Sequence, residues 1–329
     1  MAQRNAFATV SRTFGYFRDL SFEKNTLYVR RTGARIKLNA SFLRSSLSAL
    51  EIYTYLVGVR ISRILRGKRP ARTIAFFPQT AAPWYNIWSV VQLAGLRVIS
   101  DPDTADVVFL FEDNTYSSAV ARLAPQKAER AVNGACANIS KQFVADVFEQ
   151  VFGYALSVDP VVYQGTAMRK SQHNGSHDGV VVECPIPANT VAPGFAYQKL
   201  IDTSDDGGKT QQDLRVAFVR GEIATVFEKY KATDKRFGTE YLRVFLRRAD
   251  EVFSEEECKQ IIEYCQLVGL DFGAVDILRS RTDGRIYIVD VNKTCMPVLS
   301  LPLGKQIEAY RRITDAFMRR CVDGKTFNA

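Results

Sequence analysis

The hydrophobic pattern starts with one long helix and then changes to short alternating elements. Apolar residues recur three and four positions apart through residues 41–66, which predicts a helix that Gly67 ends. The elements predicted next are a buried strand at 73–77, a helix at 84–94, and two strands at 97–100 and 105–112. This order is typical of a small open α/β unit, whose ligand edge is the carboxyl end of its strands.

The rest of the chain is richer in strands. The predicted elements are a helix at 141–152, strands at 166–170, 179–184, 196–201, 213–219 and 221–227, and helices at 255–268 and 305–322. Residues 202–212 are polar and contain two glycines, so we expect a mobile loop there. Strands joined by tight turns, with the helices set apart from them, favour an α+β fold for this half.

The composition excludes several classes of protein. Apolar residues make up 47% of the chain and charged residues 24%, as in ordinary globular proteins, so the chain is not disordered or a coiled coil throughout. The longest apolar candidate for a membrane span, residues 49–65, contains three charged residues and fails. The N-terminus has no apolar signal-peptide core, and the six cysteines show no Cys-x-x-Cys pair. We therefore expect a cytoplasmic protein with reduced thiols.

Positive charge is concentrated at the N-terminus. Residues 1–72 hold fifteen Lys and Arg against three acidic residues, a net charge of +12, whereas the rest of the chain has a net charge of −3. Two interpretations stay open. The segment is either a solvated helix with an extension packed on the body, or an arm that docks peripherally on an anionic membrane surface. We expect no nucleic-acid partner.

The most informative pattern is a hairpin within residues 273–292. Two apolar strands flank the Thr-Asp-Gly sequence at 282–284, which is a hairpin signal. With a three-residue turn centred there, Asp276 and Asp290 lie directly opposite each other on one face. Asn292 follows Asp290 by two residues and therefore points to the same face.

Two carboxylates and a carboxamide oxygen at the open end of this hairpin predict a Mg²⁺ site. Mg²⁺ takes oxygen ligands and leaves its remaining positions to water and phosphates. The alternative is a pair of incidental surface acids, but Asp290 lies in an apolar run, where an unpaired carboxylate is costly to bury. Lys170 and the glycine-bearing loop after it would add a cation and backbone N–H groups suited to a triphosphate.

The order of these elements resembles the ATP-grasp superfamily, as in D-alanine–D-alanine ligases and ribosomal-protein glutamate ligases. In that family an Asp precedes a Glu/Asp-x-Asn on the adjacent strand, and Asp276, Asp290 and Asn292 match these Mg²⁺ ligands. The resemblance covers roughly residues 73–320. It implies an α+β ATP-grasp fold, with a small α/β leading domain at 73–130 and an ATP-grasp domain at 131–329 whose lobes are 131–195 and 196–329. The basic N-terminal extension at 1–72, with its one long helix, precedes these parts.

The resemblance also implies a set of nucleotide-binding residues. Lys141 and Lys170 match the two nucleotide lysines, and Gly175 to Gly179 match the flexible glycine loop. Asp213 matches the acidic residue that binds the ribose hydroxyls. The interdomain hinge, which in the family offers backbone groups to adenine, corresponds to Gln198, Lys199 and Leu200, with Gln198 in place of the usual Glu.

Two residues are expected to be catalytic. Lys229 and Arg236 fall where the family places basic groups on the γ-phosphate or acyl-phosphate, but Ala274 replaces a catalytic Arg that some members carry. The resemblance implies an ATP-dependent ligase that activates a carboxylate as an acyl-phosphate and joins it to an amine, thiol or hydroxyl. One Mg²⁺ would lie between Asp276 and Asp290 and a second between Asp290 and Asn292.

The expected substrates are a small-molecule carboxylate and an amine-type acceptor. Two other functions stay open. A small-molecule or carbohydrate kinase would need a base, for which Glu112 or Asp113 is available, and the missing arginine at Ala274 favours a nucleotide-binding module without turnover.

Overall fold

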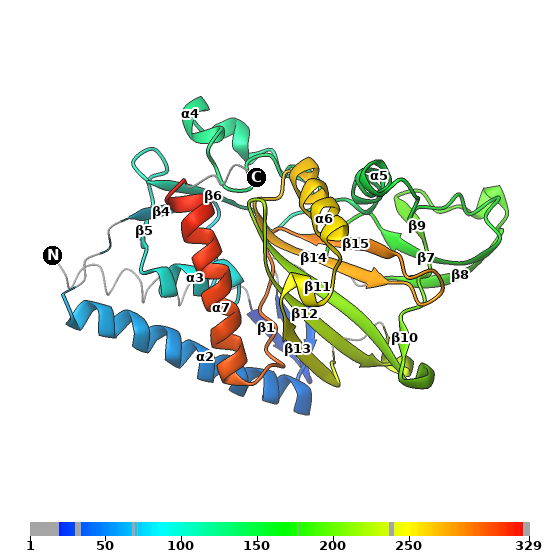
Figure 1. Cartoon of the computed structure of the whole chain (residues 1–329), viewed down its shortest axis with the longest axis horizontal. Coiled ribbons are helices and arrows are strands. Elements are labelled where there is room, and N and C mark those ends of the chain that lie inside the picture. Colours follow the sequence, from blue (N-terminus) through cyan, green and yellow to red (C-terminus); the bar gives the residue numbers. More distant parts are fainter. Residues whose placement is uncertain are drawn as a thin grey trace.

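Sheets and helices alternate through the chain in the computed structural model (Figure 1). The structure describes residues 20–29, 34–67, 70, 72–176, 178–236 and 240–324. These residues form four β-sheets, three of which are antiparallel and one parallel. No helix within these ranges is long and apolar enough to cross a bilayer.

A small antiparallel sheet precedes the long helix, and the hydrophobic pattern did not predict it. Its strands are β1 (Leu20–Glu23), β2 (Thr26–Val29) and β3 (Ala34–Lys37), which are too short for an alternating pattern to stand out. The predicted helix is present as α2 (Ala40–Leu65), capped by the Asn39 carboxamide, which accepts from the Phe42 amide at 2.9 Å. Of the extension expected at 1–72, residues 1–19, 30–33, 68, 69 and 71 lie outside the described residues.

The strands and helix predicted between residues 73 and 112 are present. They are β4 (Thr73–Pro78), α3 (Asn86–Ala94), β5 (Arg97–Ile99) and β6 (Val107–Phe111), and α4 (Pro125–Ala128) follows. Because β4 pairs in parallel with β5 on one side and β6 on the other, their carboxyl ends share one edge. Gly95, with a φ of 71°, ends α3 in the left-handed conformation.

Two antiparallel sheets make up the second half and confirm its predicted α+β organisation. In the small sheet, β7 (Gly165–Ser171) lies between β8 (Val180–Cys184) and β9 (Phe195–Lys199). The large sheet has the order β13-β12-β11-β14-β15, and β10 pairs with β11. Its strands are β10 (Ser204–Asp205), β11 (Thr210–Val219), β12 (Glu222–Ala232), β13 (Arg243–Arg247), β14 (Phe272–Arg279) and β15 (Ile286–Asn292). The longer helices are α5 (Lys141–Phe152), α6 (Glu255–Val268) and α7 (Leu303–Phe317).

Two local predictions were wrong. The stretch 202–212, expected to be a loop, contains the short β10–β11 pairing. In the β14–β15 hairpin, Asp276 pairs with Asp290 as predicted, but the turn is not the predicted three-residue one. The Ser280 amide donates to the Arg285 carbonyl at 2.8 Å, so four residues lie in the loop between them. With this loop alone, Asp276 would pair with Val289. A β-bulge at Val289 inserts one extra residue into β15 and restores the pairing with Asp290. The bulge therefore keeps both aspartates on one face.

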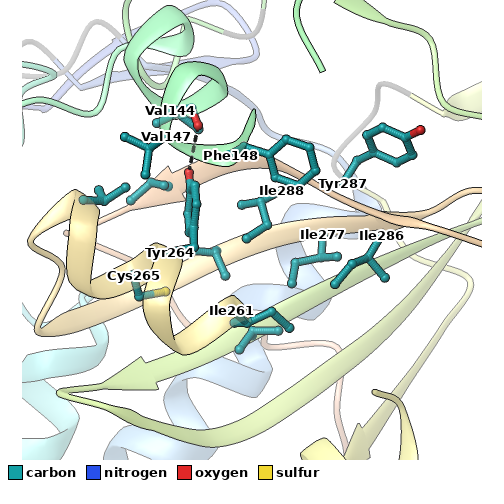
Figure 2. Close-up of a cluster of buried hydrophobic side chains, with 14 of the residues drawn as sticks. Val144, Val147, Phe148, Ile261, Tyr264, Cys265, Ile277, Ile286, Tyr287 and Ile288 are labelled. Atoms are coloured by element: carbon teal, nitrogen blue, oxygen red, sulfur yellow. Dashed lines mark hydrogen bonds between the residues drawn. The ribbon is translucent and has the colours of Figure 1, made fainter. Parts of the chain in front are cut away.

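One face of the large sheet carries an apolar core that packs under α5 and α6. Figure 2 shows this core, in which Phe148 of α5 stacks on Tyr287 of β15 and the Tyr264 hydroxyl donates to the Val144 carbonyl at 3.4 Å. The strands contribute alternate residues to it: Leu214, Val216, Phe218, Val226, Val275, Ile277, Ile286, Ile288 and Val291. This core fixes the position of α5, and so of Lys141 at its first turn.

The opposite face of the large sheet changes character along the strands. At one end it is apolar and packs against α3, α7 and the parallel sheet, through Ala217, Val219, Phe227, Phe272 and Ala274. At the other end, the residues that continue the same alternation are charged: Asp213, Arg215, Lys229, Lys231 and Asp276. The polar end of this face is the candidate site.

We predict that Phe148→Ala destabilises the protein strongly. The ring is fully buried and stacks on Phe152 with centroids 4.5 Å apart, so its removal leaves a cavity and costs about 3–5 kcal/mol. Gln150→Ala, at an exposed position of the same helix, should change the free energy of unfolding by no more than about 0.5 kcal/mol. Urea unfolding of both variants tests this. A loss below about 1 kcal/mol for Phe148→Ala would show that this core does not hold α5 in place.

Candidate functional site

Asp276 lies at the centre of the polar end of the large sheet. Arg215, its partner on β11, donates from Nε and Nη2 to the two carboxylate oxygens at 2.9 and 2.8 Å. Lys229 Nζ lies 3.2 Å from Oδ1, and the Asn292 amide donates to Oδ2 at 3.2 Å. Burial by itself would raise the pKa of Asp276, but the Arg215 and Lys229 charges outweigh it and hold this pKa well below its usual range.

Asp290 is paired with Lys141. The Lys141 ammonium donates to Asp290 Oδ1 and also lies 3.2 Å from the Asn174 carboxamide oxygen. Lys141 is the first residue of α5 and only 6% exposed, and at this end the helix dipole disfavours a cation. A buried lysine at this position therefore needs anions, which Asp290 supplies in part and a phosphate would supply further.

The small sheet adds a lysine and a carboxamide. Lys170 on β7 donates to Gln198 Oε1 on β9 at 3.1 Å. Burial lowers the pKa of Lys170, and Asp290 counters this while Lys141 adds to it. Gln198 is 1% exposed, and its Nε2 is buried with no hydrogen-bond partner among the described residues. Such an amide is a donor that a bound molecule could satisfy.

A third ion pair lies further along β11. Asp213 Oδ2 is 3.0 Å from Lys231 Nζ, and the Tyr241 ring lies 5.3 Å from the Lys231 ammonium and from that of Lys229. The Arg236 guanidinium donates to the carbonyl of Ile201. Burial lowers the pKa of Arg236, and the nearby Asp213 opposes this shift.

Two backbone N–H groups of the hinge, which was expected to contact adenine, already donate to other backbone carbonyls. The Lys199 amide donates to the Leu156 carbonyl at 2.9 Å, and the Leu200 amide donates to the Thr166 carbonyl at 3.3 Å. An adenine at Gln198–Leu200 would therefore have to use the carbonyls of this stretch or the Gln198 side chain.

The glycine loop joins β7 to β8, as predicted. Gly175 has a φ of 77°, which suits glycine. At Gly179 an added Cβ would lie 3.1 Å from the Met168 sulfur. Residue 177, which the loop prediction includes, lies outside the described residues. The side-chain amide of Asn174, the residue before Gly175, donates to Asn292 Oδ1 at 3.4 Å. The loop therefore contacts one of the three predicted Mg²⁺ ligands.

The predicted residues thus come together from four parts of the chain, namely α5, the small sheet, β11–β12 and the β14–β15 hairpin. Sequence reasoning missed Arg215, Lys231, Asn174 and Tyr241. The first two were recognisable, because Arg215 follows Asp213 by two residues and Lys231 follows Lys229 by two on the same strand faces. No local pattern marks the other two.

The acidic edge of the parallel sheet meets the end of the hairpin. Asp113, which follows β6, accepts from the Tyr85 hydroxyl at 2.6 Å and from the Thr294 hydroxyl at 2.5 Å. Glu112 accepts from the Ser117 hydroxyl at 2.5 Å. Asp113 therefore links the leading strands to the segment after Asn292.

The chemistry of the donor set fits Mg²⁺. Asp276, Asp290 and Asn292 offer only oxygen donors for a metal, and their side chains converge from adjacent strands. Within the described ranges, no group of three or more His, Cys, Asp and Glu side chains is placed to hold a metal. An ion here would thus keep most of its positions for water and phosphates, as Mg²⁺ does.

Comparisons with known proteins found similarity in fold but not in sequence. No protein-family model matches the chain, and no curated protein matches it. Among solved structures, the ATP-grasp ligase PsnB with precursor peptide PsnA2 and AMPPNP is 14% identical; 75% of this chain aligns with 99% of that chain at a TM-score of 0.48. The macrocyclase MdnC from Microcystis aeruginosa MRC, bound to precursor peptide MdnA, is 13% identical, with 77% and 99% of the chains aligned and a TM-score of 0.44.

A D-alanine–D-alanine ligase from Bacillus anthracis complexed with ATP is 10% identical. Here 77% of this chain aligns with 98% of that chain at a TM-score of 0.48. At such identities and TM-scores, the function has to be argued from the residues of this chain.

We predict that Asp276→Asn destabilises the ligand-free protein near neutral pH. The change leaves Arg215 and the buried Lys229 without their carboxylate, which costs about 3–5 kcal/mol for a buried pair. Because the folded pKa of Asp276 is depressed, its contribution is present above the unfolded pKa of about 3.9 and is lost as the pH falls below that value.

The stability gap between the wild type and Asp276→Asn should therefore be constant from pH 6 to 8. Below about pH 4 it should narrow by about 1.4 kcal/mol per pH unit. Denaturant unfolding across this pH range measures it. A gap that does not change with pH down to pH 3 would mean that Asp276 is not held ionised by its neighbours.

Proposed function

We propose that this chain is an ATP-dependent ligase of the ATP-grasp type. The observation that carries the proposal is the excess of positive charge at the polar end of the large sheet. Among the described residues, four carboxylates, those of Asp202, Asp213, Asp276 and Asp290, lie near six cations there: Lys141, Lys170, Arg215, Lys229, Lys231 and Arg236. A surplus of buried or half-buried cations is costly unless an anion joins them, and a magnesium-bound triphosphate carries the required charge.

In this proposal the nucleotide lies between the small and large sheets. The buried Nε2 of Gln198, which lacks a partner among the described residues, and the backbone of Lys199 and Leu200 would contact the adenine. Asp213 would accept from the ribose hydroxyls. Lys170, one strand away from Gln198, and Lys141 at the start of α5 would neutralise the phosphates, with backbone N–H groups of the Gly175–Gly179 loop above them.

Mg²⁺ would be held by Asp276, Asp290 and Asn292. The proposed number is two ions, with Asp290 shared between them. When bound, they neutralise the β- and γ-phosphates and orient the γ-phosphate for in-line transfer. Arg215 and Lys229 contact Asp276, so both cations would lie beside the phosphates that the ions neutralise.

The proposed reaction needs no base in its first step. An ionised substrate carboxylate attacks the γ-phosphorus, the bond to the β–γ bridging oxygen breaks, and ADP leaves. Lys229 and Arg236 would stabilise the charge that develops on the transferred phosphoryl group, helped by Arg215. An amine then attacks the acyl carbon, inorganic phosphate leaves and the nitrogen loses a proton, which forms a carbon–nitrogen bond. A small-molecule carboxylate and an amine-type acceptor are the proposed substrates.

Product analysis tests the proposal. The protein is incubated with ATP, Mg²⁺, hydroxylamine and a panel of small carboxylates and peptides. A ligase forms ADP and a hydroxamate, because hydroxylamine traps the acyl-phosphate. A stable phosphorylated product would instead identify a kinase. If the protein binds ATP but forms no ADP with any panel member, even when an amine is supplied, it is a binding module and the ligase proposal is wrong.

We predict that Asp290→Asn lowers ATP turnover by at least a hundredfold while the fold is kept. The change removes the carboxylate charge that both proposed ions share. The negative charge on the transferred phosphate would then be neutralised less well, so the transfer slows. Asp250→Asn, in an exposed pair with Arg248 far from the site residues, is the matched control and should retain wild-type turnover. Circular dichroism checks the fold. Near wild-type turnover in a folded Asp290→Asn protein would remove Asp290 from the metal site.

Asp213→Ala should raise the KM for ATP by about tenfold and lower kcat less than that. Ribose contacts are equally strong in the ground and transition states, so their loss weakens binding without slowing the chemical step. Steady-state kinetics with varied ATP separates the two parameters. A fall in kcat at unchanged KM would instead place Asp213 in catalysis or in the support of Lys231.

A further inference from the structure

Helix α2 carries an apolar stripe that stays exposed among the residues that the structure describes. Six large aliphatic side chains along it are between 45% and 66% exposed: Leu43, Leu47, Leu50, Val57, Ile61 and Ile64. Figure 1 shows α2 along one edge of the molecule, away from β14 and β15. Soluble monomers rarely expose a contiguous apolar patch above a few hundred Å², so a stripe of this length indicates an interaction surface.

The stripe has the spacing of a coiled-coil seam. With the exposed Thr54 at its centre, its positions are separated by four, three, four, three, four and three residues, which is a strict heptad repeat from Leu43 to Ile64. A general amphipathic helix presents a broader face with a period of 3.6, whereas a 3.5-residue repeat keeps a narrow seam facing a second helix. The helix has 26 residues and is therefore about 39 Å long.

The fold does not need this stripe, because α2 attaches to the body through its other face. Ile52 and Leu56 are fully buried there and pack with Leu93 of α3 and Tyr310 of α7. Arg63 extends the same attachment, since it donates to the Ala94 carbonyl at 2.7 Å. A second apolar seam on a helix already packed on the body is explained by a partner.

The charges on α2 favour a protein partner over a membrane. Arg63 points to the body, and so does Arg60, whose guanidinium donates to Gln92 at 3.1 Å. Among the side chains of α2 that the structure describes, the exposed charged ones are Arg44 and Glu51, of opposite sign. A helix that lies on an anionic bilayer needs several cations beside its apolar face, but two of the three arginines of α2, Arg60 and Arg63, contact the body instead.

We propose that the stripe pairs with the same stripe of a second copy of this chain, as an antiparallel helix pair. A two-fold axis between Thr54 and Val57 sets Leu47 against the partner's Ile64 and Leu50 against the partner's Ile61. Thr54 then meets the partner's Val57. Every seam residue from Leu47 to Ile64 is thus covered, and each pairing occurs twice, as a self-complementary two-fold interface requires. The γ-branched side chains of Leu47 and Leu50 then face the β-branched Ile64 and Ile61 of the partner, so side chains of different shape pack across the seam.

The oligomeric state of the full chain tests this proposal, and it is independent of catalysis. Sedimentation velocity is run on the wild type, Leu50→Glu and Ile61→Glu over a dilution series. Leu267→Glu is the matched control, because Leu267 is 47% exposed on another helix, α6. We expect a wild-type dimer, a dimer for Leu267→Glu, and at least a hundredfold weaker dimerisation for each stripe variant. Unchanged thermal unfolding of the variants at monomer concentrations shows that α2 remains folded.

Two outcomes overturn the proposal. One is a wild-type protein that stays monomeric up to its solubility limit. The other is a dimer that the stripe variants do not weaken. Co-sedimentation with anionic vesicles is measured in parallel, and a monomer that binds these vesicles through Leu50 and Ile61 would assign the stripe to a membrane surface instead.

Discussion

The arrangement of the site depends on the buried charge of Asp276. Its carboxylate joins three neighbouring strands, since Arg215 comes from β11, Lys229 from β12 and Asn292 from β15. Removing these groups from water costs several kcal/mol per ion, and the geometry must recover that cost through short, aligned contacts. The bidentate guanidinium meets this requirement and fixes the strand register at the polar end of the sheet.

The same sheet face serves as core at one end and as candidate site at the other. Ala217 and Ala274 pack against α7 and the parallel sheet, and two residues further along each strand the side chains are Arg215 and Asp276. The opposite face carries the apolar core that α5 and α6 cover. Charged groups can therefore stand on rigid strands without interrupting the core, which keeps them in place for a nucleotide.

Helix α5 and the small sheet bring the remaining site residues to the large sheet from distant parts of the sequence. Packing of Phe148 on the large sheet places the first residue of α5, Lys141, against Asp290, although the two are 149 positions apart. The small sheet contributes Lys170 and Gln198 from its central and outer strands. Helix α2 stands apart from all of this, attached by one face and exposed by the other, so the proposed dimer surface and the proposed catalytic groups use separate parts of the chain.

Alternation along the chain by itself determined the strand-rich second half, the strands before it and the placing of Asp276 and Asp290 on the two strands of one hairpin. These features follow from local periods of two or three to four residues, which the sequence displays directly. Tertiary structure decided the rest. The β-bulge at Val289, the contact of Asn174 with Asn292 and the pairing of Lys141 with Asp290 depend on how separate elements pack, and no local pattern carries that information. The heptad on α2 was visible as an apolar helix, but only the packed fold shows which of its two apolar faces is covered, because both faces have helical spacing.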